Sequence, residues 1–315
     1  MEVCTHTISV HQQNRYDPTR TTVLRNLFAK QMKRRFTELS VVIKKAIVDQ
    51  NCFGAPITAL QMDIPGQEAF AFRRSAEKVE AFMEWLQRQI NAGILQISQF
   101  EQIGVGAEHA WTNYYILDSY KRGVMRARAE LQRAGYNVPS IEDTGGIDMV
   151  MGTPFHIDRV GLLFTRVFSD LKGITEAMAS QIARVLAQGM VDGDGPALLA
   201  RKLLSVINGT NAAELGITDT LGRFIPASRR AMMLARTELI RAHHLATIQE
   251  YRNWALEGVY VRGEWKTAGD DRVCSDCASL EGKVYSLDEI EGMIPRHPMC
   301  RCIALPWIKE LQKYR

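Results

Sequence analysis

The residues best suited to chemistry gather near the C-terminus, where four of the six cysteines fall within the last 42 residues. Cys274 and Cys277 form a C-x2-C pair, and 19 residues later the sequence continues as His297-Pro-Met-Cys300-Arg-Cys302. Thiolate sulfur and imidazole nitrogen are preferred zinc ligands, and a structural zinc takes four of them tetrahedrally. The pattern therefore predicts a structural zinc held by four of these five residues, and the spacing does not select which four.

The alternative interpretation of these residues is a set of reduced cysteines packed in a small core. Metal binding is favoured because a short segment with few large apolar residues gains much of its folding energy from a bound ion. The chain begins with polar residues and no apolar run typical of a secretory signal, which favours metal over disulfides.

Tests for catalytic motifs give negative results. A zinc with four protein ligands has no open position for water, so it is structural rather than catalytic. The deaminase pattern requires H-x-E together with P-C-x-x-C, and the sequence contains no H-x-E, no phosphate-binding loop and no G-x-S-x-G. His243 and His244 lie in a predicted helix, where His244 shares an apolar stripe with Ile240 and Ile248. We expect hydrogen-bonded core histidines there and no enzyme activity.

A long amphipathic helix is predicted over residues 18–47, because apolar residues recur there at spacings of three or four. Its other face is basic, with Glu38 as the one acidic residue between Arg20 and Lys45. A face of one sign favours a polyanion or an acidic protein surface as partner over simple solvation. The candidate contact residues are Arg25, Lys30, Lys33, Arg34, Arg35, Lys44 and Lys45.

The remaining pattern predicts a mainly α fold: a long helical N-terminal body with a small α+β, zinc-stabilised C-terminal module. Further helices are expected at 75–90, 108–134, 160–171, 174–185, 196–209 and 227–256, and short strands at 259–265, 284–285 and 303–305. The best linker candidate is 137–154. We therefore divide the 315 residues into a helical region, 1–150, and a second region, 151–315, with helices to about 257 and a Cys/His module, 258–306. No apolar run approaches the roughly 20 residues of a membrane span.

Five segments of the C-terminal third resemble, in order and spacing, the phage Mu F-like head morphogenesis family. They are Ala235-Arg236-Thr237-Glu238, Glu264-Trp265-Lys266-Thr267-Ala268, Asp270-Asp271-Arg272-Val273-Cys274, Leu280-Glu281-Gly282 and His297-Pro298-Met299-Cys300-Arg301-Cys302. The resemblance covers about 195–306. It implies structural roles for the motif residues Arg236, Thr237, Glu238, Trp265, Asp271 and Gly282. It also makes Cys274 the doubtful ligand, since many relatives have another residue there.

The resemblance implies a minor capsid protein of a tailed bacteriophage, active in prohead assembly at the portal vertex. Such a protein is a virion component inside the head near the DNA, and is in the host cytoplasm during assembly. The implied partners are the portal protein and non-specific DNA, with scaffold or major capsid protein as further candidates. Some relatives carry an extra toxin or ADP-ribosyltransferase domain after this module, and we expect none here because nine residues follow Pro306.

Two other functions remain open from the sequence. One is a zinc-stabilised, non-specific DNA-binding protein outside a virion, and the other is a metal-dependent hydrolase. The basic helix is compatible with DNA contact or with docking on an acidic rim of the portal.

Overall fold

The computed structural model describes residues 17–54, 76–96, 110–209, 225–256, 258 and 260–307. The predicted mainly α fold is confirmed, with one small sheet in the described residues. The chain divides into two compact units that interleave along the sequence. Unit 1 comprises Met1–Phe28, Thr112–Arg166 and Leu234–Arg315, and unit 2 comprises Ala29–Trp111 and Val167–Met233.

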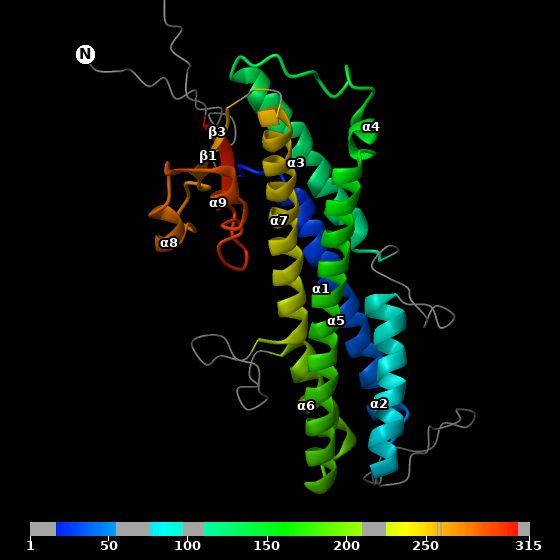
Figure 1. Cartoon of the computed structure of the whole chain (residues 1–315). Coiled ribbons are helices and arrows are strands. Elements are labelled where there is room, and N and C mark those ends of the chain that lie inside the picture. The colour runs from blue at the N-terminus through cyan, green and yellow to red at the C-terminus, as the bar shows by residue number, and fades with distance from the viewer. Residues whose placement is uncertain are drawn as a thin grey trace, which may run out of the picture. The chain divides into compact units, whose positions relative to one another are not determined.

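The helices of the structure follow the predicted periodicity closely. They are α1 (Thr22–Lys44), α2 (Ala76–Ile90), α3 (Asn113–Arg133), α4 (Ile147–Met151), α5 (Pro154–Val191), α6 (Pro196–Asn208) and α7 (Ala227–Leu256), shown in Figure 1. A π-helical turn, Lys45–Asp49, extends α1, and another, Asn91–Leu95, extends α2. The helix expected at 75–90 therefore continues for one further turn. Among the described residues, no helix has both the length and the apolarity needed to cross a membrane.

In unit 2 the apolar stripe of α1 is buried as predicted, with Met32, Phe36 and Ile43 fully inaccessible. The amide of Asn208, at the end of α6, donates a hydrogen bond to the Ser40 hydroxyl on α1 at 2.6 Å. α6 starts at Pro196, whose fixed φ and missing N–H suit the first turn of a helix. These contacts form a helical core that contains no strand among its described residues.

The expected break at Gly173 is wrong, because α5 continues through it as one helix of 38 residues. A mid-helix glycine costs only about 1 kcal/mol relative to alanine. Apolar residues on both sides of it, including Leu171 and Met178, are buried, and their packing outweighs that cost. The predicted linker 137–154 also contains structure, since α4 lies within it and Val150 and Met151 are buried.

In unit 1, α3 and α7 pack closely at Gly123. A Cβ placed there would lie 2.3 Å from the backbone oxygen of His243, so only glycine permits this approach. The Ser119 hydroxyl donates to the Leu239 carbonyl at 2.7 Å, and Arg128 Nε donates to Glu250 at 3.0 Å. These contacts make α7 the central support for the remaining elements of unit 1.

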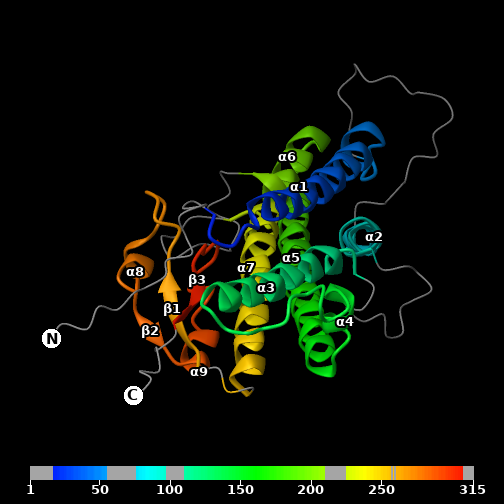
Figure 2. The same ribbon diagram turned by 90° about the horizontal axis from the view of Figure 1, so that it is seen from above.

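The Cys/His module contains the sheet, with strands β1 (Arg262–Lys266), β2 (Val284–Tyr285) and β3 (Ile303–Trp307). Both neighbours pair antiparallel with β1, which gives the order β2-β1-β3 seen in Figure 2. Two short helices, α8 (Ser275–Ala278) and α9 (Leu287–Glu291), complete it. The module lies along the C-terminal half of α7 (Figure 1).

Candidate metal centre

The first pair of predicted ligands is set by the start of α8. Cys274 is the N-cap residue, and its sulfur accepts a hydrogen bond from the Cys277 backbone N–H at 3.4 Å. An N-cap side chain points back over the first turn of its helix, which brings the two sulfurs of the C-x2-C pair to the same side. Cys277 is buried, whereas Cys274 is exposed.

The second set of ligands lies on the segment that leads into β3. Met299 has φ 63°, a left-handed conformation that is uncommon for a residue with a side chain. Its backbone N–H donates to the Thr237 hydroxyl on α7 at 2.9 Å, and the N–H of Cys300 donates to the His297 carbonyl at 3.1 Å. The resulting turn directs the ligands of this segment toward α8.

The five predicted ligands lie in two groups of three that share one residue. Nε2 of His297 lies 3.3 Å from Sγ of Cys274 and 3.3 Å from Sγ of Cys277. The potential ligand atoms form two groups, each within 4.8 Å: Cys274, Cys277 and His297, and Cys277, Cys300 and Cys302. Cys277 is common to both. Sulfur–zinc bonds of about 2.3 Å in a tetrahedron fit separations of this size, so the donor set suits a zinc ion.

The sulfurs influence one another's protonation. A hydrogen bond from Cys302 lowers the pKa of Cys300 to about 5, and the same interaction raises the pKa of Cys302. Burial raises the pKa of Cys277 to about 12. Cys300 is therefore more readily ionised than Cys277 and Cys302, and binding a metal ion would release the protons that these two sulfurs carry.

An ion pair that the sequence did not predict lies next to this site. Arg301, between two of the cysteines, forms a two-pronged pair with Asp270, with Nη1 to Oδ2 at 2.7 Å, and Arg272 contacts the same carboxylate. Hydrogen bonds from Arg301 hold the pKa of Asp270 well below its usual range. The sequence prediction named Asp271, which is exposed. The signal in the sequence that could have indicated the ion pair was the position of Asp270, directly before Asp271 in the same motif.

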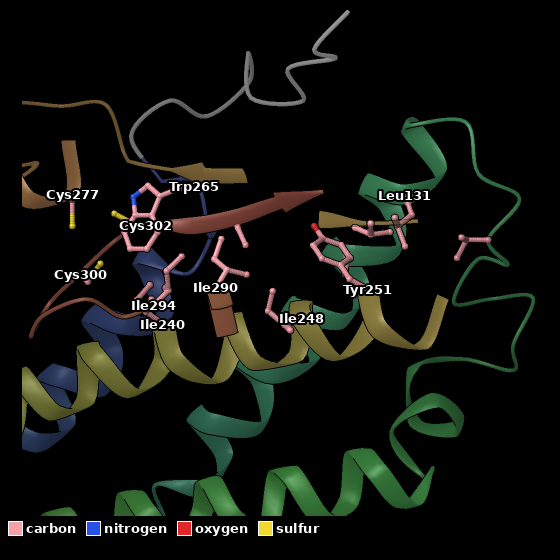
Figure 3. Close-up of a cluster of buried hydrophobic side chains, with 14 residues drawn as sticks. Leu131, Ile240, Ile248, Tyr251, Trp265, Cys277, Ile290, Ile294, Cys300 and Cys302 are labelled. Atoms are coloured by element: carbon pink, nitrogen blue, oxygen red, sulfur yellow. The ribbon is translucent and has the colours of Figure 1, made fainter. Parts of the chain in front are cut away.

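Two other motif residues lie in the core and in a tight turn beside the sheet. Trp265 on β1 is fully buried in an apolar cluster that also contains Cys277, Cys300 and Cys302 (Figure 3). Gly282 has φ +75°, and its N–H donates to the Trp265 carbonyl at 2.9 Å in the turn before β2.

On α7, the motif run Arg236-Thr237-Glu238 supports the same region. Glu238 is buried and accepts hydrogen bonds from Arg241 at 3.1 Å and Arg166 at 3.3 Å. Arg236 is half-buried, and its Nε has no partner among the described residues.

His243 and His244 are buried on α7, and neither lines the metal centre. His244 Nε2 lies 3.0 Å from the Ile290 carbonyl, which makes this nitrogen the donor. Burial lowers the pKa of His244 to about 4 and holds that of His243 well below its ordinary value. Both are neutral core residues at neutral pH, as the stripe on α7 predicted.

The seven predicted contact residues of α1 are not equivalent. Arg25 is buried and its Nη2 lies 3.2 Å from Asp17 Oδ1, so it is not part of an exposed basic face. Arg35 is half-buried, stacks 4.1 Å from the centre of the Trp111 ring and donates to the Gly93 carbonyl. Sequence periodicity could not foresee these contacts, because their partners lie in distant segments. The exposed members are Lys30, Lys33, Arg34, Lys44 and Lys45.

Residues 180–305 match the family model described as Phage Mu protein F like protein. This match confirms the predicted resemblance over that range. No curated protein and no solved structure gives a significant match. The matched range contains all five motif segments and both groups of metal-ligating residues. The family match supports a role for this chain in phage head morphogenesis and its association with the virion.

Proposed function

We propose that this chain is a minor capsid protein that acts in prohead assembly at the portal vertex and contacts packaged DNA. The observation that carries the proposal is the Phage Mu F-like match over 180–305, with its motif residues in structural positions. The Cys/His cluster also supports a structural role, because three of its sulfurs belong to an apolar core rather than to an open cleft. Four protein ligands would leave a zinc ion no open position for water, so such a site would stabilise the fold.

The ion proposed for the cluster is zinc with four of the five ligands. Cys277 belongs to both groups and is the central ligand, whereas Cys274 is exposed and is the spare position implied by the family resemblance. Elemental analysis should find about one zinc per chain in the wild type and in Cys274→Ser. Full loss of zinc in Cys274→Ser would instead place that residue inside the shell.

DNA contact is assigned to the exposed cations of α1. Lys30, Lys33 and Lys44 lie on the exposed surface of unit 2, and lysine side chains on one surface attract phosphates by releasing counterions. Replacing all three with Gln should weaken binding to a random duplex and reduce the salt slope by about 2–3. The matched control replaces Arg88, Arg184 and Arg201, three exposed cations of the same unit, with Gln. Equal loss in both variants would contradict this assignment.

Docking on the portal is the second candidate for the same surface. Val41 and Val42 are 62% and 37% exposed beside Lys44, and exposed apolar residues among cations favour a protein surface over DNA. A Val41→Ser variant should keep duplex binding. If it loses the portal protein, this surface of α1 is a docking element.

Co-purification tests the function as a whole. Proheads assembled with this chain and the portal protein should retain it at the vertex, and proheads without the portal should not. A chain that binds DNA but never enters proheads would contradict the capsid role and favour a DNA-binding protein outside the virion. Metal-dependent hydrolysis that disappears in Cys277→Ser would overturn the non-enzymatic assignment.

A further inference from the structure

A cavity of about 240 Å³ lies in unit 1, between the turn before α1 and one face of α3. Its lining contains no member of the Cys/His cluster and none of the exposed lysines of α1. Its charged lining consists of Arg20, Arg122, Arg126, Arg133, Asp17 and Glu130. Arg122, Arg126 and Arg133 recur on α3 at the spacing of one helix face.

Both carboxylates of the lining already have partners within the protein. Asp17 accepts hydrogen bonds from the Thr22 backbone N–H at 2.9 Å and from Arg25 at 3.2 Å. Glu130 accepts from the Tyr251 hydroxyl and from Arg126 Nε, each at 2.6 Å. With four arginines and two carboxylates, the lining has an excess of two positive charges.

Arg126 is one of the residues that line this cavity, and it has donors without partners. Its side chain is only 12% exposed, and Nη1 and Nη2 are buried with no hydrogen-bond partner in the described part of the chain. Buried polar groups without partners are rare in native proteins, and each calls for a ligand or another explanation. The charge of Arg126 also acts on His243 in the core. Burial is the largest cause of the low pKa of His243, and the charge of Arg126 is the second.

We propose that this cavity binds a phosphate dianion, free or as a phosphomonoester, with Arg126 as its central ligand. A guanidinium offers parallel donors that match phosphate oxygens, and arginine stays charged throughout the usual pH range. A dianion balances the excess charge of the lining, whereas a carboxylate or a phosphodiester supplies only one negative charge. The volume lies below the range of about 300–1,000 Å³ typical of sites for larger organic ligands, which fits one small group. The proposal does not depend on the capsid role.

Calorimetric titration of the full chain with inorganic phosphate tests the proposal. The wild type should bind at one site, and Arg122→Gln with Arg133→Gln should weaken binding at least about tenfold, since each removed charge-assisted hydrogen bond has an effect of that order. Both residues are exposed, so the double variant should fold. The matched control, Arg184→Gln with Arg201→Gln, removes two exposed charges from unit 2 and should bind as the wild type.

Arg126→Lys keeps the charge but loses the two-pronged geometry, so it should also bind more weakly with an unchanged far-UV spectrum. The absence of saturable binding by the wild type at millimolar phosphate would overturn the proposal. Equal weakening in the pocket variant and its control would overturn it as well.

Competition identifies the source of the phosphate. Two versions of one short duplex are compared, with and without 5′-phosphates. If only the phosphorylated duplex displaces inorganic phosphate, the ligand is a phosphomonoester at a DNA end. If neither duplex competes, the ligand is free phosphate. Displacement by the unphosphorylated duplex, or by an acidic peptide at the same concentration, would overturn the dianion assignment. Variants of Lys30, Lys33 and Lys44 should leave phosphate binding unchanged, which separates this test from the DNA-contact proposal.

Discussion

The helices α3 and α7 and the Cys/His module share one apolar core, but they differ in how much local structure supports it. Ile240, Ile248 and Tyr251 reach that core from a helix of 30 residues. The module contributes Trp265 and Ile290 from elements of five residues each. A long helix makes its backbone hydrogen bonds within its own segment and forms cooperatively, whereas strands and turns this short require external constraint.

In the module, that constraint comes from polar and sulfur groups. The ion pair of Arg301 with Asp270, the capping box of α9 and the five potential metal ligands all lie there. In α3 and α7, by contrast, close packing at Gly123 and buried hydrogen bonds, such as that of Arg128 with Glu250, join two long helices. The two regions should therefore respond differently to metal removal, acid and single substitutions.

The largest effect should follow Cys277→Ser, because Cys277 belongs to both groups of ligands. Structural zinc contributes about 10–16 kcal/mol of apparent binding energy in small zinc-dependent domains. We expect loss of the metal and of hydrogen-exchange protection in residues 260–307, with the far-UV helical signal largely kept. Cys52→Ala is the control, since Cys52 is a buried cysteine of unit 2 outside the cluster. A protected module in metal-free Cys277→Ser would show that packing alone maintains it.

Acid should destabilise the region where α7 meets the module. In the unfolded chain His244 binds a proton near pH 6.5, whereas in the fold burial lowers its pKa to about 4. Between these values the unfolded state holds more protons, so the free energy of unfolding falls as the pH falls through this window, by about 3 kcal/mol for this residue.

Urea unfolding at neutral pH and just above pH 4 measures this loss. His244→Gln can still donate toward the Ile290 carbonyl but does not titrate, so its stability should change less between the two conditions. An identical acid loss in wild type and variant would assign the effect to other groups, the metal ligands included.

The difference between the regions also explains what the sequence could reveal. Helix periodicity located α2, α6 and α7 within a few residues, because a buried stripe repeats along the sequence. The same signal failed at Gly173, where a local preference suggested a break but packing on both sides of the residue maintains one helix. Local propensity is a weak prior when tertiary contacts oppose it.

The metal-ligating residues were identifiable because cysteine and histidine at close spacing have few structural alternatives. The supporting contacts were not identifiable, since Asp270 meets Arg301 only after the module folds. Arg25 illustrates the opposite error, because its charge suggested an exposed face whereas Asp17 pairs with it in a buried position. Whether the chain divides near residue 150 remains a prediction.

Gly123→Ala should produce an intermediate effect in the helical region. The added methyl would lie 2.3 Å from the His243 backbone oxygen and 2.8 Å from the Ala246 Cβ, and neither neighbour can rotate away. Overpacking of this kind costs about 1–3 kcal/mol, partly offset by the higher helix propensity of alanine. Gly161→Ala is the control, because its added Cβ in α5 meets no atom within 4 Å beyond its chain neighbours and the backbone of its own helix turn. Thermal unfolding should show a lower midpoint for Gly123→Ala alone.

The smallest effect should follow Ser286→Ala at the start of α9. The Ser286 hydroxyl accepts a hydrogen bond from the Glu289 N–H at 3.2 Å, and the Glu289 carboxylate accepts one from the Ser286 N–H at 2.8 Å. Loss of such a cap costs about 1 kcal/mol. α9 carries Ile290, which packs against Gly263 of β1 so closely that a Cβ there would lie 2.8 Å away. The cap therefore affects the shared core through one buried side chain.

Metal content determines how far this small effect spreads. In the metal-loaded chain, hydrogen-exchange protection should fall only around α9 in Ser286→Ala, because the ligands still connect α8 to β3. After chelation the same substitution should remove protection across the module. The control is Ser279→Ala, where a hydroxyl donating to the Asp276 carbonyl is removed at the end of α8 without uncapping a helix. If Ser286→Ala acted equally with and without metal, the module would not depend on its ion, and packing against α7 would be its main support.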